Sequence, residues 1–468
     1  MKACCALSLS LLLLCLAACS KNKGPSCSFK NSTSLAATSW PKFLADVNNS
    51  GRSGADLSGN DGHGGVLFST NAAGDPIGPT ETTPVLGNPP LMYVGSADTN
   101  VYIADYTSGE VFSFPTNLQV MGPVTGTPLL GADETLFVPT NGALAQFDTS
   151  DLTSPSCCTE KSGALLPGFA AASPNIWDGD GTTYVGTLSG NFAGICPNGV
   201  SRYQISFPIT QSAAAIALDP LQPTKQTPII VAAGLGGIVR AYDVRGRQRW
   251  SFSATATIIA GVLIDPSTDL FYVADSSGRV SSGTLLNGTA NDMFNGKFRA
   301  DTGITATPVL GRDNAVVPSM YVIDNNGKLY ALDRATGAVR WTFQADGPVS
   351  GSPAVATGGA ADIIVFGADI FGVVDTSTTP VAIGGRVYAI RDDGVQGTLL
   401  WQHDTDSIGK SSPSINFDGT VFNGTVYIGR SGLRIGSGEE CPSKSGTCQV
   451  SEGGGVYAFG PNQPADSD

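Results

Sequence analysis

Histidine is almost missing from this chain of 468 residues, which contains only His63 and His403. Metal sites built from Cys and His, and catalysis by a Ser/His/Asp set, therefore have few residues to draw on. The chain also lacks a glycine loop of the kind that holds phosphate groups. The sequence thus makes no case for these common catalytic designs.

Positive charge is scarce as well. The chain has 26 Lys and Arg against 39 Asp and Glu, a net charge of −13, and only 14% of its residues are charged. An acidic surface argues against nucleic acid as a partner and against electrostatic docking on anionic lipid. It is also an ordinary means of keeping a protein soluble. The charge balance therefore excludes partners rather than naming one.

Long apolar runs are absent after the first residues, so no later segment is expected to span a bilayer. The start resembles a bacterial lipoprotein signal, with Lys2, an apolar stretch over Leu11–Leu14 and the closing run Leu16-Ala17-Ala18-Cys19. We predict a signal peptide over residues 1–18, lipid on the Cys19 sulfur and a flexible polar tether over residues 19–39. An ordinary secretory signal is the alternative.

Six of the ten cysteines would remain in the exported chain without lipid: Cys27, Cys157, Cys158, Cys196, Cys441 and Cys448. An even number in an exported chain favours disulfides over metal ligation. Cys441 and Cys448 flank a short loop, so we predict a local bridge between them.

A strand-turn-strand unit recurs eight times along the chain, at a spacing of roughly 45 residues. Each unit opens with a small residue, a proline and an apolar pair, except for two degenerate copies around residues 214 and 261. Turns such as Asn325-Asn326-Gly327 separate four short strands in each unit, which is typical of a propeller blade. We predict an all-β, eight-bladed propeller of four-stranded antiparallel blades over residues 40–461, followed by a disordered tail over residues 462–468.

The last unit lacks its fourth strand, whereas Val66-Leu67-Phe68-Ser69 stands alone near the start. We predict that this N-terminal strand completes the last blade, because the pairing removes two exposed sheet edges. The long step between the last two units indicates inserted loops around residues 375–385 and 433–453.

The segment from Ala331 to Trp341 resembles the tryptophan-docking motif of pyrroloquinoline-quinone-type (PQQ-like) propellers. Shorter or looser copies contain Trp250 and Trp401, and a further copy has Phe112 in place of tryptophan. The resemblance implies that these four aromatic side chains pack across the joints between blades. The stretch from Trp40 through Ser53 also resembles the lead-in of exported members of this group.

Quinoprotein dehydrogenases of this family carry a vicinal disulfide over the quinone, and Cys157-Cys158 is a vicinal pair. On the predicted register, however, both cysteines follow the third strand of the second blade, and Cys196 closes the third strand of the next. These positions lie on one face, so we favour a bridge from Cys157 or Cys158 to Cys196, with Cys27 bonding the remaining sulfur.

The resemblance leaves two functions open. One is a dehydrogenase that uses PQQ and calcium to oxidise alcohols or sugars. The calcium-ligating and catalytic acids of that family have no matching positions here, and Asp178-Gly179-Asp180-Gly181 lacks further oxygen ligands. Asp98, Asp324 and Asp375 recur where aspartate commonly satisfies the backbone of a turn.

The other function, which we favour, is a noncatalytic binding or scaffolding module without a cofactor. A lipid-anchored propeller resembles the BamB lipoproteins of the outer-membrane barrel-assembly machinery in overall design. The resemblance implies an envelope protein as partner and a bacterial outer-membrane location, facing the periplasm or the surface. Since a fold alone does not carry a function, the role in assembly is an analogy.

Overall fold

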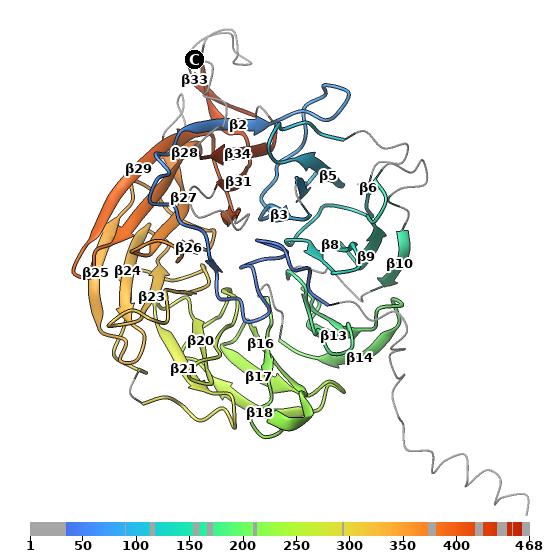
Figure 1. The fold of residues 1–468 in the computed structure, drawn as a ribbon, viewed down its shortest axis with the longest axis vertical. Coiled ribbons are helices and arrows are strands. Elements are labelled where there is room, and N and C mark those ends of the chain that lie inside the picture. Colours follow the sequence, from blue (N-terminus) through green and yellow to red (C-terminus); the bar gives the residue numbers. More distant parts are fainter. Residues whose placement is uncertain are drawn as a thin grey trace, which may run out of the picture.

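The computed structural model describes residues 34–88, 90–112, 118–152, 158, 160–165, 172–208, 213–292, 294–372, 381–416, 425–437, 447–451 and 453–460. In these ranges the chain forms eight sheets arranged as the blades of a ring (Figure 1). Apart from a 3-10 turn at Pro223–Lys225, the elements are strands. No helix within the described ranges is long and apolar enough to cross a membrane. The predicted signal, Cys19 and most of the tether precede them.

Each blade begins with a short strand near the axis and continues outward through antiparallel neighbours. Blade 1 consists of β3 (Val85–Leu86), β4 (Leu91–Gly95), β5 (Asn100–Asp105) and β6 (Leu118–Gln119). Blade 2 consists of β7 (Leu129–Leu130), β8 (Thr135–Thr140), β9 (Ala143–Asp148) and β10 (Glu160–Leu165). Blade 3 consists of β11 (Asn175–Ile176), β12 (Thr183–Gly186), β13 (Asn191–Ile195) and β14 (Ser201–Ser206). Blade 4 consists of β15 (Ala215–Leu218), β16 (Pro228–Gly234), β17 (Ile238–Tyr242) and β18 (Gln248–Ser253).

The second half of the ring follows the same plan. Blade 5 contains β19 (Leu263–Asp265), β20 (Leu270–Ala274) and β21 (Val280–Thr284). Blade 6 consists of β22 (Val309–Leu310), β23 (Ser319–Ile323), β24 (Lys328–Asp333) and β25 (Val339–Gln344). Blade 7 consists of β26 (Ala354–Ala356), β27 (Ile363–Gly372), β28 (Val381–Asp392) and β29 (Gly397–Thr405). Blade 8 contains β30 (Ser414–Ile415), β31 (Val426–Arg430), β34 (Gly455–Phe459) and the N-terminal β2 (Gly64–Phe68).

The predicted closure of the ring is confirmed. Strand β2 pairs antiparallel with β34, with Gly64 opposite Phe459 and Val66 opposite Tyr457. In Figure 1 the blue β2 lies beside the red β34, so both ends of the propeller chain belong to blade 8. Because β34 then has neighbours on both sides, the pairing leaves no open edge where the ring closes.

Three details go beyond the predicted plan. In blade 5 the outer position is taken by an irregular segment that bridges β21 at Arg279↔Arg299 and Gly283↔Ala290. In blade 7, β1 (Arg52–Ser53) adds a parallel strand on the axial side of β26. Finally, the region inserted between β31 and β34 contains a separate hairpin of β32 (Leu433–Ser437) and β33 (Thr447–Ser451).

The repeat is also visible in the core. The residue after each motif proline pairs with a second-strand residue that is often a fully buried tyrosine, as in Val85↔Tyr93 and Val309↔Tyr321. Tyr184, Tyr272 and Tyr427 hold the same place in their blades. Burying an aromatic side chain of this size contributes about 2 to 3 kcal/mol, so the recurring tyrosines stabilise blades 1, 3, 5, 6 and 8 in the same way.

Candidate functional site

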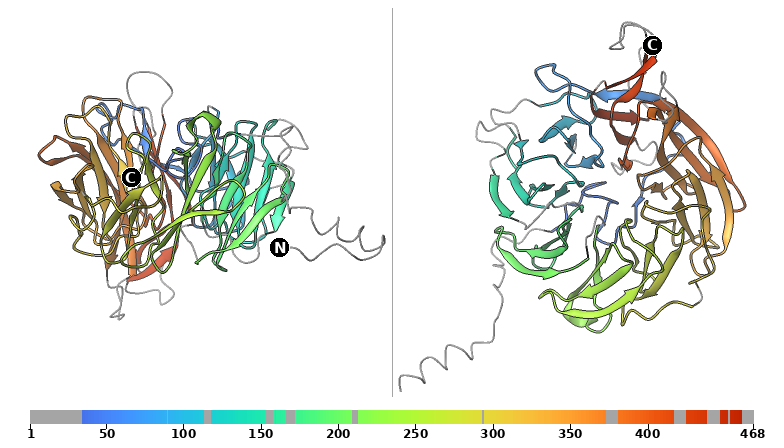
Figure 2. Two further views of the ribbon diagram at one scale, coloured as in Figure 1. Left: turned by 90° about the horizontal axis from the view of Figure 1, so that it is seen from below. Right: turned by 180° about the vertical axis from the view of Figure 1, so that it is seen from behind.

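The N-terminal residues 39–53, which we call the axial segment, lie across the centre of the ring (Figure 2). Backbone amides near the ends of six innermost strands donate to its carbonyl oxygens over 2.8–2.9 Å. The pairs are Leu86 with Trp40, Leu130 with Pro41, Ile216 with Val47, Ile264 with Asn48, Leu310 with Ser50 and Val355 with Gly51. Blade 3 is reached through Asn175 Nδ2, which donates to Val47 O, and blade 8 through Asn416, which accepts from Ser39 Oγ. The axial segment is thus bonded to all eight blades.

A buried lysine holds the turn of the axial segment. Lys42 is fully buried, and its Nζ donates to Phe43 O at 2.6 Å, Asp46 O at 2.9 Å and Asn49 Oδ1 at 2.6 Å. Asn49 in turn donates through Nδ2 to Val262 O at 2.8 Å and Ala214 O at 3.1 Å. Asn49 also has a φ of 58°, a conformation that asparagine tolerates better than most residues. These contacts connect the turn to blades 4 and 5.

The buried Lys42 is expected to make stability depend on pH. Burial lowers its pKa from 10.5 to about 7, although the nearby Asp46 acts in the opposite direction. Between these values the unfolded chain binds more protons than the folded chain, so the free energy of unfolding rises with pH. From pH 7 to pH 9 the rise attributable to Lys42 is on the order of 2 kcal/mol. Denaturant titrations at several pH values give the free energy of unfolding of the native chain and of Lys42→Met. That free energy should rise more steeply with pH in the native chain, and an equal rise in both proteins would contradict the expectation.

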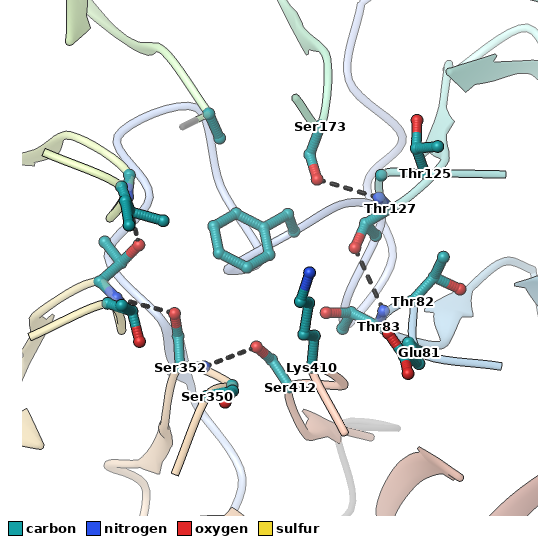
Figure 3. A pocket seen from close by; sticks show the side chains of 18 of the residues that line it. Glu81, Thr82, Thr83, Thr125, Thr127, Ser173, Ser350, Ser352, Lys410 and Ser412 are labelled. Atoms are coloured by element: carbon teal, nitrogen blue, oxygen red, sulfur yellow. Dashed lines mark hydrogen bonds between the residues drawn. The ribbon is translucent and has the colours of Figure 1, made fainter. Parts of the chain in front are cut away.

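A cavity of about 730 Å³ occupies the channel beside the axial segment. Phe43 forms part of its lining, together with residues at the start of the innermost strands of all eight blades (Figure 3). These residues are Thr83, Thr127, Ser173, Ala213, Gly261, Thr307, Ser352 and Ser412. The motif that defines the sequence repeat therefore lies at the cavity wall.

Hydroxyl groups of the motif tie neighbouring blades together around the cavity. The backbone amide at the small residue of one blade donates to the hydroxyl of the next, as Thr307 N does to Ser352 Oγ at 2.8 Å. The same bond joins Thr83 N to Thr127, Thr127 N to Ser173, Gly261 N to Thr307 and Ser352 N to Ser412. The sequence analysis used this motif to count blades and missed its role between them.

Two charged residues, Glu81 and Lys410, contribute to the cavity lining. Both side chains are exposed, and Lys410 extends from the entry of blade 8 toward the middle of the channel (Figure 3). The surrounding wall partly removes Glu81 from bulk water and so raises its pKa; the positive charge of Lys410 opposes that shift, and Asp369 adds to it. The cavity thus combines hydroxyl groups with one cation and one acid.

This lining does not fit the quinone and calcium of the alternative function. PQQ carries three carboxylates, whereas the lining offers one cation, Lys410. Calcium requires six to eight oxygen ligands, several of them carboxylates. Within the described ranges, no group of three or more His, Cys, Asp or Glu is placed to hold a metal ion.

The two acids of the calcium-like turn, Asp178 and Asp180, and the turn aspartates Asp98 and Asp324 all have partners within the protein. Asp180 pairs with Arg202, and Asp178 Oδ1 accepts from Leu35 N at 2.9 Å. Asp98 accepts from Gly78 N at 2.6 Å, and Asp324 accepts from the amide of Lys328 at 3.0 Å. Asp375 lies outside the described residues.

The docking aromatics lie at joints between blades, away from the cavity lining. Trp250 Nε1 donates to Leu285 O at 2.8 Å, and its ring stacks on Phe271 of blade 5 at 5.0 Å. Trp341 Nε1 donates to Asp392 of blade 7 at 2.8 Å. Trp401 packs against Phe459 of blade 8, and Phe112 against the core shared by blades 1 and 2.

Cys158 and Cys196 are both disulfide-bonded. Cys19, Cys27, Cys157 and Cys441 lie outside the described residues, and Cys448 lies in β33, where only the backbone is described. The pairings proposed from the sequence therefore stay predictions.

A second candidate site, which the sequence analysis missed, is a group of exposed valines at the rim of blades 6 and 7. We call Val316, Val317 and Val395 the valine patch; their exposed fractions are 103%, 36% and 82%. Arg340 joins the two loops, because its guanidinium donates to Val317 O at 3.4 Å and to Gly394 O at 2.8 Å. Single apolar residues in loops carry no sequence signal that would group them.

Ion pairs fix the loop that carries Val316. Its residue Asp313 pairs with Arg52 of the axial segment at 2.8 Å and with Arg334 at 2.7 Å. The adjacent Arg312 pairs with the buried Asp362 of blade 7 at 2.7 Å. Ion pairs therefore hold in place the loop that displays Val316 and Val317.

Comparisons with known proteins agree with this architecture. Residues 236–440 match the family model described as outer membrane protein assembly factor BamB. A protein of that name from Yersinia pestis is 25% identical over 226 residues, which cover 44% of this chain and 50% of the relative. The match thus spans about half the length of that curated relative. The crystal structure of BamB from Moraxella catarrhalis has a TM-score of 0.52 at 15% identity and covers 81% of this chain and 96% of that chain.

Proposed function

Because this chain is a BamB-like β-propeller of PQQ-type repeats, we propose that it is a noncatalytic scaffold in the assembly of outer-membrane proteins. Lipid on Cys19 would hold it at the bacterial outer membrane, and its partner would be an envelope protein. No cofactor is required for this role. The family model and the Yersinia pestis relative support the choice, since both are described as an outer membrane protein assembly factor.

The observation that carries the proposal is the valine patch. Val316 and Val395 are strongly exposed, and an ion pair holds the loop that carries Val316. Grouped exposed apolar residues of this kind mark protein interfaces. Burying one valine at an interface contributes about 1.5 kcal/mol, and a braced loop loses little conformational freedom when it binds. A rigid ring with such a patch is suited to holding a protein partner.

Deletion of the gene in its host is expected to lower the amount of folded barrel proteins in the outer membrane. The native gene should restore that amount, whereas the double variant Val316→Asp/Val395→Asp should not. As a matched control, Val200→Asp changes another exposed valine, on blade 3, and should restore the amount. Equal melting temperatures of the purified proteins would show that both variants fold.

Two results would contradict the proposal. One is an unchanged outer-membrane composition in the deletion strain. The other is enzymatic: reduction of a redox dye by the purified chain with PQQ, calcium and an alcohol or sugar would favour the dehydrogenase.

A further inference from the structure

Lys410 is held in place by the loop that carries it. Asp369 Oδ1 accepts from Ser407 Oγ and Ile408 N at 2.8 Å and from Gly409 N at 3.1 Å. On the other side of Lys410, Ser411 Oγ donates to Thr82 O at 3.0 Å. The backbone on both sides of the lysine is thus fixed, so a ligand at its ammonium group has only the lysine side chain to order.

The two charged residues of the lining lie on one side of the cavity, and apolar residues lie both beside them, as Ala97 does, and across the axis. Glu81 and Lys410 come from the entries of blades 1 and 8. Leu188 of blade 3, Ile259 at the entry of blade 5 and the aromatic Phe43 supply apolar surface. In a ring of eight, blades 4 and 5 face blades 8 and 1 across the axis, and blade 3 faces blade 7. A ligand that fills this space would place a polar group near Lys410 and an apolar group on the opposite side.

The size of the cavity limits the ligand. A volume of about 730 Å³ suits a small molecule or the end of an extended chain and is too small for a folded domain. Glu81 carries a raised pKa, which reduces its competition for the cation when the pH falls. The hydroxyl of the exposed Ser350 in the wall can donate to or accept from a polar ligand.

We propose that this cavity binds a carboxylate attached to an apolar group, either the C-terminus of an extended peptide or a small free acid, with Lys410 as the anchoring cation. A lysine acts on such a group as a point charge with three donors. The site is separate from the valine patch. The cavity includes turns between second and third strands, such as Ala97 and Leu188, whereas Val316 and Val395 lie on turns of the opposite face. The inference therefore does not depend on the proposed role in assembly.

Calorimetric titration of the full chain tests the inference with three probes. These are N-acetyl-Gly-Ser-Gly-Ala-Val-Leu with a free C-terminus, the same peptide as its C-terminal amide, and 4-methylpentanoate. The free-acid peptide is expected to bind at least tenfold more tightly than the amide. Equal binding of 4-methylpentanoate and the peptide would identify the small acid as the ligand, and much tighter binding of the peptide would identify the chain end.

Variants of Lys410 separate recognition from folding. Lys410→Met should weaken binding of the acid at least tenfold, Lys410→Arg should keep most of it, and Val200→Asp, which changes an exposed residue outside both sites, should leave it unchanged. Melting temperatures equal to that of the native chain would confirm that the variants fold. No binding of either acid, equal affinity for acid and amide, or a Lys410→Met variant that binds like the native chain would each overturn the inference.

Discussion

A chain that begins at residue 70 is expected not to form a folded monomer. It lacks β2 and the axial segment, so six inner-strand amides, among them Leu86 and Val355, lose their acceptors. A buried donor without a partner costs about 1 to 3 kcal/mol, so six of them cost roughly 10 kcal/mol. That sum is comparable with the whole stability of a typical domain, about 5 to 15 kcal/mol. The fully buried Trp40 and Leu44 would also be lost from the core.

Gel filtration and circular dichroism of the truncated chain, next to a chain that begins at Ser34, provide the measurement. The longer chain keeps β2 and the axial segment and should elute as a compact species with a cooperative unfolding transition. The truncated chain should aggregate or unfold without such a transition. A compact truncated monomer with a cooperative transition would show that the ring closes without its N-terminal residues.

The second large effect is expected at Asp392, which joins blades 6 and 7. Asp392→Ala should lower the free energy of unfolding by about 3 to 5 kcal/mol, since it leaves several buried donors without an acceptor. The side chain is largely buried, and burial together with Asp362 and Asp392 raises the pKa of the Tyr321 hydroxyl well above its usual value. The donors to Asp392 are Trp341 Nε1 at 2.8 Å, Tyr321 OH at 2.8 Å, Ser319 Oγ at 3.0 Å, Arg340 Nη1 at 3.3 Å and Gly394 N at 2.7 Å.

The neighbouring Asp393 supplies a matched control for this prediction. It pairs with Arg391 at the surface, and such pairs contribute little to stability. Asp393→Ala should therefore leave the midpoint of a urea titration unchanged, while Asp392→Ala shifts it strongly. Similar midpoints for the two variants would show that Asp392 does not couple the blades.

The ring of blades and its closure could be predicted from the sequence, whereas the contacts behind the two predictions above could not. Repetition made the fold predictable, because each small-Pro-apolar run must pair locally with the following strand. The N-terminal strand could be placed because the last unit lacked one and Val66-Leu67-Phe68-Ser69 had no other partner. Periodic patterns of this kind depend on near neighbours in the chain.

The roles of the axial segment and of Asp392 depend on contacts between residues that are far apart in the sequence, and no local pattern predicts such contacts. The resemblance of Trp40 through Ser53 to a lead-in segment suggested neither the buried Lys42 nor the bonds to all eight blades. Asp392 is the last residue of β28, before a turn, and most of its donors come from blade 6 across the joint. The cavity charges are a similar case, since Glu81 and Lys410 are far apart in the sequence and face one space only after the ring closes.

The valine patch could not be predicted from the sequence for a different reason. Val316 and Val395 belong to separate turns, and the guanidinium of Arg340 joins the two loops. A sequence gives no weight to one exposed valine, whereas a surface with several of them on braced loops indicates an interface. The binding role was therefore predicted from the resemblance, and the surface that would perform it came from the structure.

Hydrogen exchange of the inner-strand amides tests most directly whether the chain seals its own ring. In the full chain, the amides of Leu86, Leu130, Ile216, Ile264, Leu310 and Val355 donate to the axial segment. They should exchange as slowly as amides in the middle strands β4 and β23, because both open only when the ring unfolds. Exchange of these six amides within seconds, while the middle strands stay protected, would show that the axial segment leaves the channel freely.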